Sequence, residues 1–339
     1  MFYILLILLL LLLLVGLKIH TCGSPSHDFN LQETLPLRGF LAICVMLTHL
    51  CPYLADEAPL LNDFGLWGPP SVGAFFLLAG YGLAFSYRKK GDAYLHGFFK
   101  KRLLRLLWPL LIMTLVYQGY KAYYGCFSLT EMLVCPSPMS WFIYALVIWY
   151  VGYYVAFRLW GARNVQIALV WIFTLLYLLF TISLNMGYYY ISILPMPMAL
   201  TYVFYEEKVK AFISRHDKWV WAVVLLTTII VMDYAVAGQY GMKLPGWGLP
   251  VYTFVPCVIV YITYYLGGWK NKVTNFLGHI SYEFYIVHGF IVMQLGHCHL
   301  FGLTGYANAM LIILLVLGLT TLSAWVLSNL CVKINNSLK

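Results

Sequence analysis

Charged side chains are scarce in this sequence, and acidic ones are the scarcest. Only 10% of the 339 residues are charged, whereas 62% are hydrophobic. A soluble domain needs far more charge on its surface, so this composition excludes a soluble protein and indicates an integral membrane protein. With 12 Asp and Glu against 21 Lys and Arg, the formal net charge is +9. Basic residues that hold cytoplasmic loops in place explain this surplus better than nucleic-acid binding, and we expect no nucleic-acid partner.

The cysteine and histidine spacings of metal sites are also missing. The eight cysteines form no C-x-x-C pair and no zinc-binding pattern. His297, Cys298 and His299 are adjacent residues, which cannot easily share one tetrahedral metal ion, so we expect no metal site. Cys126 and Cys135 fall at a predicted outer boundary, where a disulfide can persist. A bridge between them and a pair of reduced thiols both fit the sequence.

Hydrophobic segments long enough to cross about 30 Å of hydrocarbon follow one another along the chain. A leucine-rich segment covers residues 2–17. Ten further crossings are predicted, at 36–54, 69–87, 103–124, 139–158, 165–183, 188–204, 219–236, 248–268, 276–296 and 306–330. All should be helices, because lipid offers backbone groups no partners and barrel strands would alternate in polarity. The predicted fold is all-α and polytopic, a ten-helix core plus one extra N-terminal transmembrane helix.

The distribution of basic residues predicts the orientation. If residues 18–35 are cytoplasmic, 18 of the 21 Lys and Arg fall on the cytoplasmic side. Only Lys121 and Lys243 fall outside, and Arg38 lies at a helix start. This bias predicts an N-terminus outside and a C-terminus in the cytoplasm.

We expect three parts in the chain: the extra N-terminal transmembrane helix in residues 1–20, a membrane domain in residues 34–332, and a short cytoplasmic tail at 333–339. The first segment could instead be a cleaved signal peptide. It has no basic residues before the leucines and no A-x-A-like cleavage site after them, which favours a retained helix.

Arg38 and His49 are unusual because they stand in an otherwise membrane-like segment, "PLRGFLAICVMLTHL", at residues 36–50. At about 100° per residue, a separation of eleven residues places both on one helix face, roughly 16 Å apart along the axis. Ionisable groups at membrane depth are costly and by default mark function. The alternatives are an arginine that snorkels to the interface and a histidine that is only part of the core.

Two other segments carry polar groups. "FFKKRLLRLLWPL", at 98–110, places Arg102 and Arg105 three residues apart at a cytoplasmic helix start, where guanidinium groups can bind phosphate or simply anchor the helix among anionic lipids. "LGHISYEFYIVHGF", at 277–290, forms a polar stripe from residues at i, i+4 and i+7. The stripe consists of Ser281, Tyr285 and His288.

These positions resemble the acyltransferase-3 family of integral membrane acyltransferases. The family has an arginine, ten intervening residues and a histidine in its first core helix, matched by Arg38 and His49. Its R-x-x-R motif opens the third core helix and is matched by Arg102 and Arg105.

The resemblance extends over about residues 34–330. An F-F-x-x-S-G motif appears as "FFLLAG", at 75–80, with Ala79 in place of the serine, so a ligand-binding role for that hydroxyl is not available here. Trp141 lies in a segment that resembles the family's W-[FY]-[IL] motif. The late S-Y-x-x-Y-x-x-H motif is matched by Ser281, Tyr282, Tyr285 and His288.

The resemblance implies transfer of an acyl group, usually acetyl, from cytoplasmic acyl-CoA to a hydroxyl of a cell-surface or lipid-linked glycan, in a bacterial inner membrane. No cofactor is expected, since acyl-CoA is a substrate. His49 would be the general base or would briefly carry the acyl group. The residues expected to bind acyl-CoA are Arg38, Arg102 and Arg105, and those expected to support the site are Ser281, Tyr282, Tyr285, His288 and Trp141.

Two other classes of function fit parts of the sequence. A transporter or flippase for a glycan intermediate would line its pathway with Arg38, Asp233 and Glu283, and it predicts inverted internal repeats. The prolines at 193–200 interrupt one predicted crossing, but no counterpart and no convincing self-similarity appear. A non-enzymatic assembly partner would use its intramembrane polar residues only for helix packing.

Overall fold

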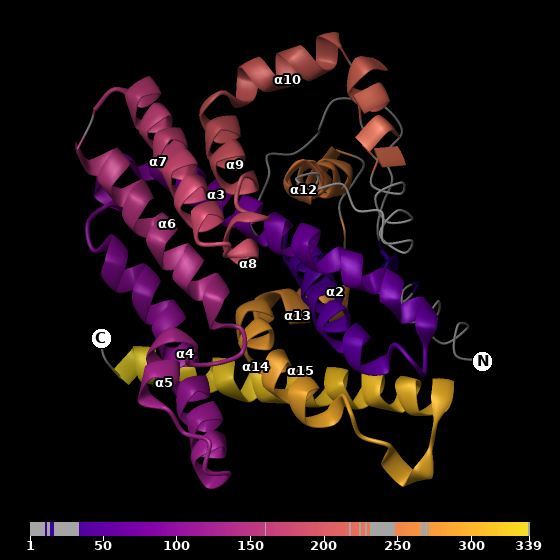
Figure 1. Cartoon of the computed structure of the whole chain (residues 1–339). Coiled ribbons are helices and arrows are strands. Elements are labelled where there is room, and N and C mark those ends of the chain that lie inside the picture. Colours follow the sequence, from indigo (N-terminus) through magenta and orange to yellow (C-terminus); the bar gives the residue numbers. More distant parts are fainter. Residues whose placement is uncertain are drawn as a thin grey trace. The chain divides into compact units, whose positions relative to one another are not determined.

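The computed structural model describes residues 11, 14–16, 34–159, 161–216, 218–223, 225–227, 229–230, 248–265, 269 and 271–337. Within these residues every regular element is a helix, which confirms the all-α prediction (Figure 1). The α-helices are α2 (Leu35–Leu54), α3 (Gly68–Lys90), α4 (Phe98–Tyr123), α5 (Leu129–Val134), α6 (Ser140–Leu159), α7 (Arg163–Ser183), α8 (Gly187–Tyr190), α9 (Pro195–Phe204), α10 (Glu206–Arg215), α12 (Gly248–Tyr265), α13 (Lys272–His279), α14 (Ser281–Leu295) and α15 (Gly305–Ser337). The 3-10 helices are η1 (Pro59–Trp67), η2 (Gly91–Tyr94) and η3 (Leu300–Gly302).

Six helices in the described part of the chain are long and apolar enough to cross a membrane, or seven if the bent pair α13–α14 is one span. The six are Leu35–Leu54, Phe64–Tyr94, Phe98–Tyr123, Ser140–Leu159, Arg163–Ser183 and Gly305–Ser337. The polytopic prediction is therefore confirmed in kind, but the structure does not reproduce the predicted count of ten core crossings. Most of the predicted N-terminal helix, the last part of the crossing at 219–236 (residues 231–236), and Asp233 lie outside the described residues.

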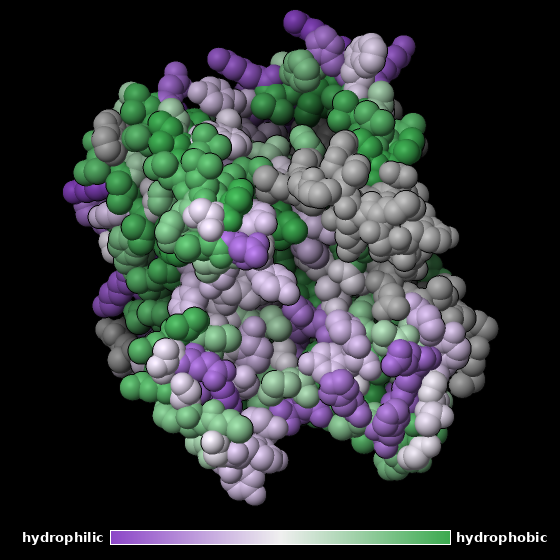
Figure 2. Space-filling view, viewed as in Figure 1, coloured by the Kyte–Doolittle hydropathy of each residue, from purple (hydrophilic) through white to green (hydrophobic). Residues whose placement is uncertain are grey.

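The surface over α6 and α7 has the composition of a lipid-facing surface. Figure 2 shows apolar side chains gathered over these helices. Large apolar side chains that are more than half exposed follow the outer face of α7. They are Ile172, Leu175, Leu176, Leu179 and Phe180. Water would make such a continuous apolar face costly, whereas lipid does not.

Two predicted crossings are interrupted. The segment predicted to cross at 188–204 consists of α8 and α9, and the ten residues of α9 span only about 15 Å. Pro195 is the reason, because proline has no N–H to donate inside a helix and therefore begins a new one. The segment predicted at 276–296 consists of α13 and α14, which are bent by 84°. Here the Ser281 hydroxyl donates to the Gly278 carbonyl oxygen, 3.0 Å away, at the bend.

The chain forms two compact units. The first contains residues 1–68, 99–144 and 265–339, and the second contains residues 69–98 and 145–264.

In the first unit, α2 and α14 run side by side in the same direction. Near its start, α2 packs closely on α13. The close approach is seen at two glycines: a Cβ added to Gly39 would overlap the Thr274 carbonyl, and one added to Gly278 would overlap the Leu35 carbonyl. Near its end, Tyr53 of α2 lies against Gly296, just beyond α14. The glycines therefore allow the two backbones to meet at the bend before α14.

The directions of the other long helices of this unit, α4 and α15, can be given relative to α14. Helix α4 runs parallel to α14, in the same direction. Two contacts show this: the Tyr282 hydroxyl donates to the Leu106 carbonyl, and the Tyr120 ring lies 5.4 Å from that of Phe290. Helix α15 runs in the opposite direction, because Asn308 near its start donates to Glu57, just beyond the end of α2. These relative directions are the ones that the predicted topology requires.

The second unit contains a buried carboxylate between two cations. Glu206, at the start of α10, accepts from Arg88 at 2.6 Å and from Lys210 at 2.9 Å. Burial alone would raise the pKa of Glu206, but hydrogen bonds from Lys210 and Arg88 outweigh it and hold the pKa below its usual range. A carboxyl whose pKa is lowered on folding stabilises the protein above its unfolded-state pKa, and this contribution is lost as the pH falls through the folded-state value.

Replacing Glu206 by glutamine should therefore destabilise the protein at pH 7, by about 2 kcal/mol, since hydrogen bonds to charged groups contribute this much. The difference from wild type should shrink as the pH falls below about 4, where wild-type Glu206 also becomes protonated. Thermal unfolding in detergent at several pH values measures both effects. The control is Glu207→Gln at the exposed neighbouring position, and equal stability of the two variants at pH 7 would contradict the prediction.

Candidate functional site

His49 and His288 meet in the first unit. His49 lies on α2 and His288 on α14, and their ring centroids are 5.3 Å apart at an angle of 40°. His288 is completely buried, whereas His49 is half-buried. The parallel course of the two helices brings the rings together, although they are far apart in the chain.

The backbone fixes the tautomer of His288. Its Nδ1 lies 3.2 Å from the carbonyl oxygen of Phe284. A carbonyl oxygen can only accept, so Nδ1 carries the proton and Nε2 keeps a free lone pair. This Nε2 is buried and has no hydrogen-bond partner among the described residues. His288 therefore presents a basic nitrogen beside His49.

Aromatic rings enclose the histidine pair on one side. The Tyr285 ring lies 5.5 Å from His288, and the Phe142 ring lies 4.9 Å from Tyr285. Trp141 packs edge-on against Phe142, at 6.1 Å. The Tyr285 hydroxyl is buried and, like His288 Nε2, lacks a partner within the described chain. Because an unpaired buried polar atom costs about 1–3 kcal/mol, two such atoms on neighbouring rings indicate a place that binds a polar group.

The three arginines of the predicted site lie at the end of the unit where α2, α4 and α14 begin. Arg102 and Arg105 are in the first two turns of α4, next to Leu106, which accepts from Tyr282. From that level to His288, α14 rises about 9 Å. Arg38 is in the first turn of α2, about 16 Å before His49. The guanidinium groups thus lie on one side of the histidine pair along the helix axes.

The remaining predicted residues have mainly structural contacts. Ser281 bonds to Gly278 at the bend, and Tyr282 joins α14 to α4. Glu283 hydrogen-bonds Ser328 of α15 and interacts electrostatically with Arg105. The sequence left open whether Asp233 or Glu283 orients a histidine, and the contacts of Glu283 are with these other partners.

Sequence reasoning ranked His288 only as a supporting residue and missed its pairing with His49. The available signal was the presence of one histidine in each of two apolar crossings. Which two crossings are neighbours was not readable from the sequence.

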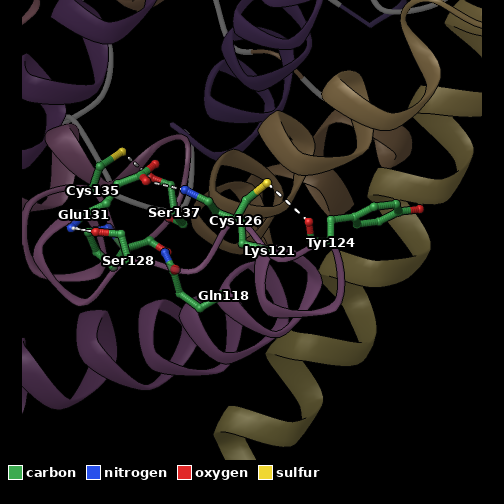
Figure 3. A network of polar contacts seen from close by, with 9 residues as sticks. Gln118, Lys121, Tyr124, Cys126, Ser128, Glu131, Cys135 and Ser137 are labelled. Carbon is green, nitrogen blue, oxygen red and sulfur yellow. Dashed lines mark hydrogen bonds and ion pairs between the residues drawn. The ribbon is translucent and has the colours of Figure 1, made fainter.

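The sequence left a Cys126–Cys135 bridge open and predicted no metal site. Cys126 and Cys135 are free and exposed, each with its sulfur near a backbone oxygen of Tyr124 or Ser137 (Figure 3). The structure therefore has the reduced thiols rather than the bridge. In the part of the chain that the structure describes, no three His, Cys, Asp or Glu side chains are grouped as metal ligands.

Comparison with known families identifies the family of the chain. The sequence profile of the acyltransferase-3 family, described as an acyltransferase domain, matches residues 37–329. Searches of curated proteins and of solved structures found no match. The matched region contains the histidine pair and all three arginines, and it covers most of the chain. The protein therefore belongs to the acyltransferase-3 family of membrane acyltransferases.

Proposed function

We propose that this protein transfers an acyl group, acetyl or another short acyl group such as succinyl, from cytoplasmic acyl-CoA to a hydroxyl of a cell-surface or lipid-linked glycan. The observation that carries the proposal is the contact of His49 with His288, whose Nε2 is held as a buried, unpaired base. Such a pair can take a proton from a hydroxyl, which is the step that makes an alcohol nucleophilic. The proposed location is a bacterial inner membrane.

His49 is the proposed catalytic residue. It removes the proton from the acceptor hydroxyl while the oxygen attacks the thioester carbon, the C–S bond breaks, and the CoA thiolate takes up the proton. In the alternative order, a nitrogen of His49 attacks the thioester carbon, the C–S bond breaks, and CoA leaves as the thiol with the proton that the imidazole gives up. The acceptor hydroxyl then attacks the acyl-imidazole, the bond from nitrogen to the acyl carbon breaks, and the imidazole takes the hydroxyl proton. In both orders the Nε2 lone pair of His288 stabilises the proton on the neighbouring ring, and Tyr285 with Phe142 and Trp141 shields the site from water.

Arg38, Arg102 and Arg105 are the proposed binding groups for acyl-CoA. Guanidinium groups bind phosphate through two parallel hydrogen bonds, and CoA carries several phosphate oxygens. The positive-inside bias puts the end of the unit with these arginines in the cytoplasm, where acyl-CoA is present. The acceptor would then approach the histidine pair from the outer side.

The proposal is tested with purified protein in lipid nanodiscs, labelled acetyl-CoA, and a lipid-linked saccharide extract from host membranes. We expect free CoA and labelled saccharide to appear in equal amounts. A transporter or an assembly protein would release no CoA. If no CoA is released from acetyl-CoA, nor from succinyl-CoA in a second assay, the proposal is overturned. Mass spectrometry of surface polysaccharides from cells with and without the gene identifies the natural acceptor.

Replacing Arg102 or Arg105 by alanine should raise KM for acetyl-CoA by about 10- to 100-fold, since hydrogen bonds to a charged group contribute about 1.5–3 kcal/mol. The same variants should behave like wild type with acetyl-pantetheine, which has the thioester but no phosphate. Arg158→Ala, at an exposed cation on another predicted cytoplasmic helix end, is the control. An equal loss with both donors would show that the arginines do not act on the phosphates.

A further inference from the structure

Two buried side chains outside the predicted site each have a polar atom without a hydrogen-bond partner among the described residues. Gln118 of α4 is 5% exposed, and Ser137, between α5 and α6, is 0% exposed. Gln118 Nε2 donates to the Pro136 carbonyl oxygen at 3.3 Å, which identifies Oε1 as the free acceptor. Gln118 Oε1 and Ser137 Oγ have no hydrogen-bond partner in the described chain. Figure 3 shows both residues in the polar network between α4 and α6.

The polar groups around them are already bonded. The Ser140 hydroxyl donates to the Ser137 carbonyl oxygen at 2.8 Å. Lys121 forms an ion pair with Glu131. Each unpaired buried atom costs about 1–3 kcal/mol, and an apolar side chain of similar shape would avoid that cost. Two such atoms, one of them on a side chain that hydrogen-bonds the residue before the other, therefore indicate binding of a polar ligand.

The chain neighbours of both residues pack on the turn of α14 that follows His288. The segment after Ser137 packs on Gly289, where an added Cβ would be 2.7 Å from Met139 and 3.3 Å from Pro138. The turn of α4 that carries Gln118 packs on the next residue, since the Tyr117 and Tyr120 rings lie 6.2 Å and 5.4 Å from Phe290. Gly289 and Phe290 directly follow His288. The segments that carry Gln118 and Ser137 thus pack on α14 directly after His288.

The chemistry of the two free atoms selects the ligand. An amide oxygen can only accept a hydrogen bond, whereas a serine hydroxyl can donate and accept. A ligand hydroxyl has the complementary capacity, because it can donate to Gln118 Oε1 and accept from Ser137. The ion pair of Lys121 with Glu131 leaves no net charge beside them, so a charged ligand group would remain uncompensated. The tyrosine rings of α4 are suited to pack on the apolar face of a sugar.

We propose that Gln118 and Ser137 form an acceptor subsite that binds a second, non-reacting hydroxyl of a polyhydroxylated acceptor such as a saccharide. The subsite holds the acceptor so that a neighbouring hydroxyl faces His49 and His288. This inference rests on the proposed function, because it assigns the acceptor of that same reaction.

The test is Ser137→Ala in nanodiscs, with the lipid-linked saccharide extract as acceptor and acetyl-CoA as donor. We expect KM for the extract to rise about tenfold, as one lost hydrogen bond predicts. KM for acetyl-CoA and the slow hydrolysis of acetyl-CoA by water should not change. Gln118→Leu is the second variant and should also raise KM for the extract.

Unfolding temperature separates binding from a structural role. Removing an unpaired hydroxyl should leave the free protein as stable as wild type or more so, whereas removing a bonded one should destabilise it. The matched control is therefore Ser140→Ala, which removes the bonded hydroxyl of the same segment. It should lower the unfolding temperature without changing KM for the extract.

The outcomes are distinct. If wild-type protein transfers no acyl group to the extract, the proposed function fails and the subsite with it. If wild type is active and both Ser137→Ala and Gln118→Leu keep the wild-type KM for the extract, only the subsite is overturned. A lower unfolding temperature of Ser137→Ala together with the rise in KM would also overturn it, since the hydroxyl would then be a structural group.

Discussion

Replacing His49 by alanine should reduce acyl transfer by at least about 10³-fold, because a positioned general base contributes roughly 10²–10⁴ to the rate and an acyl carrier contributes more. The protein should still insert and purify normally, since His49 is half-buried and its side chain is not part of the tightly packed contact between α2 and α13. CoA release and label transfer measure the effect. His96→Ala, at an exposed position, is the control and should keep full activity.

A His49→Ala variant with wild-type activity would overturn the proposed mechanism. His288→Asn is expected to have a smaller effect, because this residue supports the proton on its neighbour. Wild-type protein mixed with acetyl-CoA without an acceptor distinguishes the two orders of reaction. A burst of one CoA per protein indicates an acyl-histidine, and the absence of a burst indicates direct transfer.

Replacing Gly278 by alanine should destabilise the protein by about 3 kcal/mol or more. The new Cβ would overlap the Leu35 carbonyl oxygen, and two packed backbones cannot both keep their positions. Gly39→Ala should act in the same way through the Thr274 carbonyl. Because these contacts hold the start of α2 on the bend before α14, the variants should also lose activity. Unfolding temperature and the monodisperse fraction in detergent measure the loss.

The matched control is Gly318→Ala on α15. A Cβ there would meet nothing within 4 Å, so this variant should be as stable as wild type or gain up to about 1 kcal/mol from the better helix propensity of alanine. If Gly278→Ala unfolded at the same temperature as Gly318→Ala, the close backbone contact of α2 with α13 would be contradicted.

Much of the architecture was readable from local sequence. Runs of apolar residues predicted the long helices, because a single helix in lipid satisfies its own backbone whatever its neighbours are. The R-x-x-R and R-x10-H spacings placed Arg102, Arg105, Arg38 and His49 near helix starts or on one helix face, since these relations depend only on helical geometry. The prolines at 193–200 marked the interruption before α9.

Other features depended on which helices pack together. Hydropathy gave one crossing at 276–296, but the close contact of Gly278 with Leu35 and the bond of Ser281 divide it into α13 and α14. The same glycine contacts set the register in which α14 lies along α2, and only this register brings His288 to His49.

Sequence by itself therefore determined most of the long helices, the relative directions of α2, α4, α14 and α15, and the family, because each follows from local composition and spacing. The tertiary structure alone decided the histidine pair, the free Nε2 of His288 and the unpaired atoms of Gln118 and Ser137. Those features are contacts, or missing contacts, between residues that are distant in the chain. They exist only once side-chain packing has fixed which helix turns face each other.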